Sequence, residues 1–341
     1  MKILVGIPTY NNSRSNYSIR QTLEALSNQT IKNFHVLIVY KPSPGDRTLD
    51  VVSEFKDRLD IEVKIQSYGF FEEAMNIIFE ASKDYDITLT TDDDAIPSET
   101  WINEHVIFHK NHDRIAIVHG ITIPTTHYCY EHLRTVKLLI NYYKPLIKLM
   151  VNYSNFIIND IGLLACKGKE PFNGNANTHD YELDIGIGGV NMSFKSGPYI
   201  DGFSLPGYTI RGICNEQLLA LHYLKQGFNA ASFNGGAVRH LERESLSRPK
   251  DPRTTGIEEY LLPYGVHYYG FKINMRKLKL YYNLVRLYSK IRKTPLSKAY
   301  RAGLELAIEA IENNYEPKEI RSRFIEFLSE RHRFMNFRVE C

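Results

Sequence analysis

The sequence contains few cysteines and no long apolar run. Among its 341 residues are only four cysteines, with no CxxC pair and no spacing typical of metal ligands: Cys129, Cys166, Cys214 and Cys341. Cysteines scattered in this way favour reduced thiols in a cytosolic protein over a disulfide framework or a zinc site. No segment approaches the roughly 18–20 consecutive apolar residues that a membrane-spanning helix needs.

The sequence also has little net charge. The formal charge is +3 and the pI is about 8.4, which is too mild to predict a nucleic-acid partner. The first residues, MKILVGIPTY, are too short for the apolar part of a signal peptide and lead into polar residues. We therefore expect a cytoplasmic protein without a nucleic-acid partner. Association with the cytoplasmic face of a membrane is left open.

The first ninety residues alternate short apolar runs with segments of helical spacing. Pro8 is expected to stop the first strand. Such alternation is typical of a parallel sheet covered by helices on both faces, where ligands bind beyond the carboxyl ends of strands. The predicted strands are residues 3–7, 34–39, 62–66 and 86–90, and the predicted helices are residues 18–26, 49–55 and 72–81.

Three consecutive carboxylates, Asp92, Asp93 and Asp94, follow the fourth predicted strand. Like charges this close repel one another, which a solvated surface turn tolerates and a site for a hard cation exploits. An Asp-x-Asp arrangement lets two carboxylates reach one side of a turn. A divalent cation held there keeps positions open for phosphate oxygens. The location at a strand end favours the binding site.

Four stretches together resemble a family 2 glycosyltransferase of the GT-A fold, over roughly residues 1–245: ILVGIPTYNN, FHVLIV, TTDDDAIPSETWI and a later acidic motif. The resemblance implies an α/β fold with a Rossmann-like, mainly parallel sheet flanked by helices, and a helical C-terminal extension. It also implies that the aspartates of the segment TTDDDAIPSETWI hold Mg²⁺ or Mn²⁺, which bridges the diphosphate of a nucleotide-sugar donor.

The same resemblance assigns roles to individual residues. Asp94 would be the direct metal ligand, Asp92 would lie near the ribose or the metal, and Asp93 could share either role. The loop that would cradle the nucleobase and ribose comprises Pro8, Thr9, Tyr10 and Asn11.

The turn after the second strand departs from the family pattern. Tyr40 and Lys41 stand where the family has acidic residues, one of which reads the base, and only Asp46 matches a later acid of that turn. The identity of the nucleobase therefore stays open.

Further candidates follow later in the chain. Gly188 and Gly189 match a glycine pair where the backbone approaches the donor sugar, although a β-bulge is the plainer interpretation. Glu216 matches the general base that takes a proton from the acceptor hydroxyl, and a carboxylate also suits a helix start. His240 matches an additional metal ligand, although single histidines are more often surface or core residues.

Three arginines lie beside or after His240 in the sequence: Arg239, Arg243 and Arg248. They could neutralise the leaving diphosphate through paired hydrogen bonds, or form a solvated basic stretch.

Two other parts of the chain have helical spacing. Residues 133–150 form an amphipathic pattern with Pro145 inside, which fits either a packed helix or an element facing membrane or a lipid-linked acceptor. From about Pro263 the chain is expected to be helical throughout. Residues 276–293 hold seven Lys or Arg and no acid, which fits a packed helix with snorkelling cations or contact with an anionic membrane.

The resemblance implies a GT-A domain over residues 1–250, and the helical spacing predicts a helical region over residues 251–341. Within the first, residues 1–121 would bind nucleotide, residues 122–181 would be a variable insertion, and residues 182–250 would serve the acceptor. The expected activity is inverting, metal-dependent transfer of a sugar from a nucleotide-diphosphate sugar to a hydroxyl of a glycan or lipid-linked acceptor.

Two alternatives are weighed against this activity. One is a non-catalytic GT-A protein that binds nucleotide-sugar or a membrane surface. The other is a sugar-1-phosphate nucleotidyltransferase, which would need a glycine-rich basic loop after the first strand, where this chain has PTYNNSRSN. The donor sugar and the oligomeric state stay open.

Overall fold

The fold is taken from a computed structural model of the chain. The structure describes residues 1–123, 151–153, 156–158, 181–212, 214–241 and 253–332. The amphipathic pattern of residues 133–150, with the kink predicted at Pro145, lies outside the described residues, as do Arg243 and Arg248.

The main sheet has eight strands in the order β10-β12-β6-β11-β4-β1-β2-β3. Strands β4, β1, β2 and β3 are parallel, and β12 is parallel to β6, while β11 and β10 run antiparallel to their neighbours. The expected mainly parallel sheet is therefore confirmed. Its strands are β1 (Ile3–Tyr10), β2 (His35–Lys41), β3 (Ile61–Ile65), β4 (Ile87–Thr90), β6 (Ile115–His119), β10 (Tyr181–Leu183), β11 (Met192–Lys195) and β12 (Asn229–Phe233).

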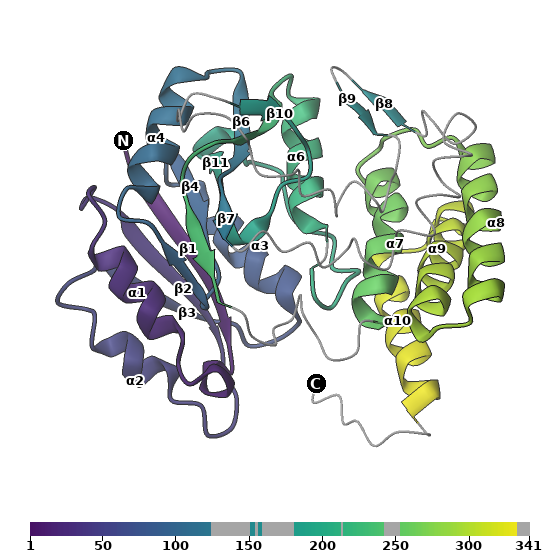
Figure 1. Cartoon of the computed structure of the whole chain (residues 1–341), viewed down its shortest axis with the longest axis horizontal. Coiled ribbons are helices and arrows are strands. Elements are labelled where there is room, and N and C mark those ends of the chain that lie inside the picture. The colour runs from purple at the N-terminus through teal and green to yellow at the C-terminus, as the bar shows by residue number, and fades with distance from the viewer. Residues whose placement is uncertain (124–150, 154–155, 159–180, 213, 242–252, 333–341) are drawn as a thin grey trace.

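Helices cover both faces of this sheet, as Figure 1 shows. Ile3, Val5 and Ile7 of β1 pack in one buried cluster with α1, α2 and α4, whereas Leu4 packs in another with α3 and α6. Successive strand side chains point to opposite faces, so β1 is buried on both. The helices are α1 (Ile19–Ser27), α2 (Thr48–Ser53), α3 (Phe71–Ser82), α4 (Trp101–Asn111) and α6 (Asn215–Lys225), with short 3-10 turns at Asn12–Ser15, Gly189–Asn191 and Gly197–Tyr199.

The expectation that Pro8 ends the first strand is wrong, because β1 continues to Tyr10. The pairing of β1 with β4 stops at Gly6, and beyond it β1 pairs with β2 alone. A proline has no backbone N–H to donate, so it disrupts a strand that is paired on both sides. It is tolerated where one side of the strand is unpaired.

A small second sheet, β5-β13-β7, joins distant parts of the chain. Its strands are β5 (Ala95–Pro97), directly after the three aspartates, β13 (Val238–His240) and β7 (Thr122–Ile123). Because β13 pairs antiparallel with β5, His240 lies opposite Ala95. A separate pair is formed by β8 (Val151–Tyr153) and β9 (Phe156–Ile158).

The C-terminal region is helical, as expected, and consists of α7 (Arg253–Tyr268), α8 (Met275–Arg292), α9 (Pro295–Asn313) and α10 (Pro317–His332). The predicted start near Pro263 is wrong, because α7 begins at Arg253 and holds Pro263 in its interior. Packing explains the tolerance, since residues 256–266 of α7 are all buried and tertiary contacts offset the lost backbone bond.

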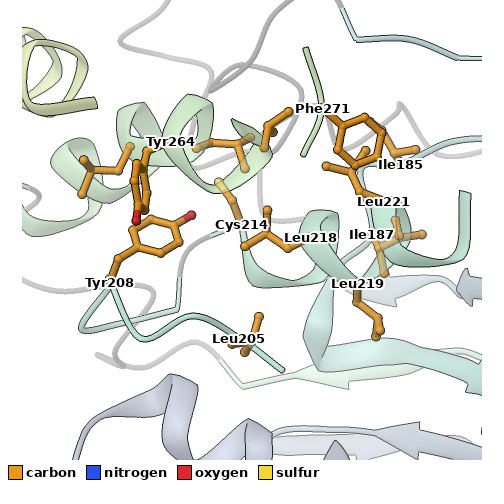
Figure 2. Packing of buried hydrophobic residues seen from close by; sticks show 14 of the residues in the cluster. Ile185, Ile187, Leu205, Tyr208, Cys214, Leu218, Leu219, Leu221, Tyr264 and Phe271 are labelled. Atoms are coloured by element: carbon orange, nitrogen blue, oxygen red, sulfur yellow. The ribbon is translucent and has the colours of Figure 1, made fainter. Parts of the chain in front are cut away.

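This helical region shares one core with the sheet. The largest buried cluster runs from Leu4 in β1 to Phe324 in α10. Figure 2 shows part of this cluster, in which Leu218 and Leu219 lie on α6 and Tyr208, from the segment before α6, faces Tyr264 of α7. In the part of the chain that the structure describes, no helix is both long and apolar enough to cross a membrane.

Candidate active site

Three side chains that could ligate a metal meet at the carboxyl end of β4. One ligand atom from each of Asp92, Asp94 and His240 lies within 4.8 Å of the others. The Nε2 atom of His240 is 3.1 Å from an Asp94 carboxylate oxygen and 3.5 Å from one of Asp92. Neighbouring ligands of an octahedral Mg²⁺ lie about 3 Å apart, so these spacings suit adjacent positions around a small divalent cation.

The surroundings of this cluster suit a bound cation with an open side. The Asp94 side chain is 2% exposed and that of His240 is 7% exposed, whereas that of Asp92 is 32% exposed. The pairing of β13 with β5 holds the histidine in place, and the Leu241 N–H donates to the Asp94 carbonyl at 2.9 Å. The buried Asp94 and His240 form the inner side of the cluster, which leaves the side of the more exposed Asp92 for substrate oxygens.

Asp93 points in another direction. Its carboxylate accepts a hydrogen bond of 2.5 Å from the Thr9 hydroxyl, and its backbone carbonyl accepts one of 2.9 Å from the Ser18 hydroxyl. Asp93 therefore ties the acidic turn to the loop after β1, and it is not part of the Asp92–Asp94–His240 cluster.

Asn12 holds the same junction and was not singled out in the sequence. It is fully buried, its amide nitrogen lies 3.2 Å from the Ser18 hydroxyl oxygen, and its amide oxygen accepts from the Ile19 N–H at 3.1 Å. The signal was the polar run NNSRSN between a strand and a helix, where side chains replace missing backbone partners.

The predicted nucleoside loop lies at the carboxyl end of β1. Pro8, Thr9 and Tyr10 are its last strand residues, and Asn11 follows with φ 50°. An Asp46 carboxylate oxygen accepts from the Ser13 N–H at 3.2 Å, so the turn after β2 reaches this loop. The structure therefore brings all five predicted donor residues of this end to one edge of the sheet.

The unusual turn residues Tyr40 and Lys41 have different surroundings. Burial, followed by the charge of Asp46, raises the pKa of the Tyr40 hydroxyl. The Lys41 ammonium donates to the Gly69 carbonyl at 2.7 Å and lies 5.5 Å from the ring centre of Tyr10 and 5.4 Å from that of Phe70. A cation among aromatic rings thus occupies the edge where the family places acids.

Glu216 lies at the start of α6 and packs directly on Gly189. A Cβ atom on Gly189 would come 2.1 Å from a Glu216 carboxylate oxygen, whereas one on Gly188 would meet nothing closer than 4.0 Å. The Gly189 carbonyl also accepts from the Thr90 hydroxyl of β4 at 2.9 Å. The absence of a side chain at position 189 therefore leaves the space that the Glu216 carboxyl group occupies.

The ionisation of Glu216 is shifted towards neutrality. Burial, with the nearby charge of Asp92 adding to it, raises the pKa of the Glu216 carboxyl to about 7. A carboxyl with such a pKa takes up and releases a proton near neutral pH, as a general base requires.

Asn191 is a second buried residue that the sequence analysis did not single out. Its amide nitrogen donates to the carbonyls of Ile121 and Gly236, at 2.8 and 2.7 Å. Its amide oxygen accepts from the Trp101 indole at 2.8 Å. Asn191 therefore links the segment after Gly189 to the turn before β13. A buried amide cannot be recognised from a sequence until its partners are known.

Arg239 lies apart from the cluster. It is exposed on β13 between the buried Val238 and His240, so its side chain points to the other side of the strand from the histidine.

Comparisons with known proteins find a family match for part of the chain. Residues 4–160 match the model of glycosyl transferase family 2. No curated protein matches the sequence.

Two solved structures from S. aureus are similar. TarS 1-349 in complex with UDP-GlcNAc has 12% identity and a TM-score of 0.51, over 97% of this chain and 92% of that one. A longer TarS chain has 14% identity and a TM-score of 0.50, over 84% of this chain. The match spans 43% of that longer chain. At these identities the likeness establishes the fold.

Proposed function

Because residues 4–160 belong to glycosyl transferase family 2, we propose that this protein is an inverting, metal-dependent glycosyltransferase. It transfers a sugar from a nucleotide-diphosphate sugar to a hydroxyl group of a glycan or lipid-linked acceptor. Residues 1–250 carry the reaction, and the C-terminal region, helical over the described residues 253–332, is an extension. The proposal includes a cytoplasmic location.

The metal cluster is the observation that carries this proposal. Asp92, Asp94 and His240 come from segments 146 residues apart, yet their ligand atoms lie within 4.8 Å. A bound Mg²⁺ or Mn²⁺ would stabilise the negative charge that develops on the departing diphosphate.

The strand order supports one orientation of the donor. The acidic turn follows β4, which lies between β1 and β11. Glu216 and Gly189 stand on the β11 side, so the sugar and acceptor belong there. The nucleoside, at the other end of the diphosphate, then lies over the ends of β1 and β2, beside Tyr10 and Lys41.

Glu216 is proposed as the general base. Its carboxylate takes the proton of the acceptor hydroxyl while that oxygen forms a bond to the anomeric carbon. The bond between this carbon and the diphosphate oxygen breaks at the same time, and the diphosphate keeps the electron pair. A single displacement inverts the anomeric configuration, because attack and departure occur on opposite faces.

Calorimetric titration tests the donor site. UDP, GDP, TDP and CDP are titrated with Mn²⁺ or with EDTA into the wild type, Asp94→Ala and, as a control, Asp50→Ala. Asp50 is an exposed carboxylate on α2 that pairs with Arg47. We expect one nucleotide to bind only with metal, the Asp94 variant to lose this binding, and the Asp50 variant to keep it. Binding of no nucleotide, or binding unaffected by Asp94→Ala, would contradict the proposal.

A non-catalytic nucleotide-sugar binder is the second candidate. Lys41, seated between Tyr10 and Phe70 where the family has acids, is the observation that favours it. Slow hydrolysis of the donor separates the two candidates. A hydrolytic activity that needs metal and disappears in Glu216→Gln supports the enzyme, and donor binding without any turnover supports the binder.

A further inference from the structure

Helix α8 carries a stripe of large apolar side chains on its outer surface. Leu280, Leu287 and Ile291 are 37%, 50% and 65% exposed. They are seven and four residues apart, so at 3.6 residues per turn they fall within roughly 40° of one another. Exposed apolar residues are ordinary when scattered, but three in line on one helix form a patch.

Packing of the helix does not account for this stripe. The other side of α8 buries Leu278, Tyr281, Val285 and Tyr288 in the shared core. The inner face therefore already satisfies the need of an amphipathic helix for a buried side. In Figure 1, α8 lies in the helical part of the molecule, remote from the main sheet.

Cations flank the stripe, and α8 contains no acid. Arg276, Lys279, Arg286, Lys290 and Arg292 are its exposed cations. The acids of the neighbouring helix α9 pair with other cations or lie near the edge of this face. Glu312 pairs with Lys279, Glu309 pairs with Arg323 of α10, and Glu305 lies 3.9 Å from Arg301. They do not cancel the charge along the outer face.

We propose that this outer face binds the surface of an anionic lipid membrane. The α8 face, defined by Leu280, Leu287, Ile291, Arg286 and Lys290, would lie parallel to the bilayer with its apolar stripe at the level of the acyl-chain boundary. The long basic side chains then reach the anionic headgroups. Neutral lipid would make favourable contacts with the apolar stripe alone, and a soluble polyanion would make them with the cations alone.

The composition of the face favours lipid over nucleic acid. Binding to single-stranded nucleic acid uses exposed aromatic rings on which bases stack. Of the three tyrosines of α8, Tyr281 and Tyr288 are buried and Tyr282 is half-buried, and the large apolar side chains that are exposed on this helix are aliphatic. Contact with phosphates does not stabilise leucine and isoleucine side chains, whereas their transfer from water to the acyl region of a membrane is favourable.

Vesicle co-sedimentation of the full chain tests the proposal. The vesicles contain phosphatidylcholine alone or phosphatidylcholine mixed with phosphatidylglycerol. The variants are Leu287→Ser/Ile291→Ser, which removes apolar contacts, and Arg286→Gln/Lys290→Gln, which removes two cations. The control is Leu49→Ser/Ile65→Ser, which alters two exposed apolar residues on α2 and β3. All six positions are exposed, so the fold is expected to persist in each variant.

The wild type and control should bind the anionic vesicles and bind neutral ones much more weakly. At about 1 kcal/mol per basic residue, loss of two cations should weaken binding by roughly thirtyfold. The serine variant should weaken it at least tenfold and should leave residual binding that added salt abolishes.

Three results would overturn the proposal. The first is absence of binding to either vesicle, and the second is equal binding to both. The third is binding to anionic vesicles that salt removes and the serine variant leaves intact, which would indicate a polyanion site. Self-association of the chain that is lost in the serine variant, without vesicle binding, would indicate a second copy as the occupant instead.

Discussion

The sheet edge around Asp94 and the outer face of α8 use charge in opposite ways. At the sheet edge, acids are drawn into the protein, where the Asp94 side chain is only 2% exposed and His240 faces it. On α8, cations stand in water beside exposed aliphatic side chains. Burying a charge costs free energy unless a partner compensates, whereas exposing one costs little. The buried acids at the sheet edge therefore indicate a bound cation by themselves. The exposed cations of α8 indicate a ligand only together with the apolar stripe beside them.

The sheet and the helical region, to which these two surfaces belong, are nevertheless joined by a buried ion pair. Arg321 of α10 donates to Glu73 and Glu72 at the start of α3, at 2.5 and 2.8 Å. The Glu72 side chain is fully buried, and burial raises the pKa of its carboxyl to about 7 although Arg321 opposes this. The helical region is thus tied to a helix that packs on the sheet, close to the loop that holds Lys41.

The largest effect is expected at Glu216. Replacement by Gln removes the proposed base, so the transfer rate should fall by about 10²–10⁴-fold. Vesicle binding by α8 should not change. Steady-state transfer with Mn²⁺, beside co-sedimentation, measures both. A rate close to that of the wild type would remove Glu216 from the mechanism, because loss of a general base should cost about 10²-fold or more.

The pH dependence of transfer follows from the same residue. Because the base must be ionised and burial raises its pKa to about 7, the rate should rise as pH increases through about 7. An ordinary glutamate would be ionised throughout this range and would give a flat profile. A profile of kcat against pH distinguishes the two.

The effect of breaking the contact between α10 and α3 should come next in size. Arg321→Ala leaves Glu72 and Glu73 without their guanidinium partner. Breaking such a buried pair should lower the free energy of unfolding by about 3 kcal/mol. This is the lower end of the usual range, because a buried carboxyl that has lost its partner can take up a proton. Arg323→Ala is the matched control, since its side chain is 39% exposed and its pairs with Glu309 and Glu319 contribute about 0–1 kcal/mol. Urea unfolding measures both. Equal losses would mean that α10 docks without this ion pair.

Replacement of Gly189 by Ala should separate the base from stability. The new Cβ would occupy the space of the Glu216 carboxylate, which is the end of a flexible side chain and moves away cheaply. A displacement of about 1 Å costs roughly a hundredfold in rate, with little change in melting temperature. Gly188→Ala, where space is available, should retain activity. Similar losses in both variants would contradict the assigned role of Gly189.

The smallest effect is a gain in stability. In the folded state the pKa of Glu216 is about 7, above its ordinary value of 4.5, so the native protein holds this proton more tightly than the unfolded chain. Ionisation therefore costs native stability as pH rises from 4.5, and the cost is complete above about 7. Glu216→Gln should stabilise the protein at pH 8 by about 1–3 kcal/mol, less at lower pH. Denaturant melts at both pH values check the sign.

Much of the fold follows from local patterns in the sequence. Apolar runs and helical spacing predicted the strands and helices of the first ninety residues, because both depend on neighbouring side chains. The extension of β1 through Pro8 was missed, because it depends on where the pairing with β4 stops. The start of α7 was missed for a related reason, since packing offsets the effect of Pro263.

The candidate site divides in the same way. That Asp92, Asp93 and Asp94 follow a buried strand, and that Glu216 stands at a helix start, can be predicted from local sequence alone. Three contacts depend instead on how the chain folds: Asp93 with Thr9, His240 with Asp94 across β13 and β5, and Glu216 with Gly189. The physical reason is distance along the chain: each of these contacts joins segments brought together by strand pairing or packing, which neighbouring residues do not encode.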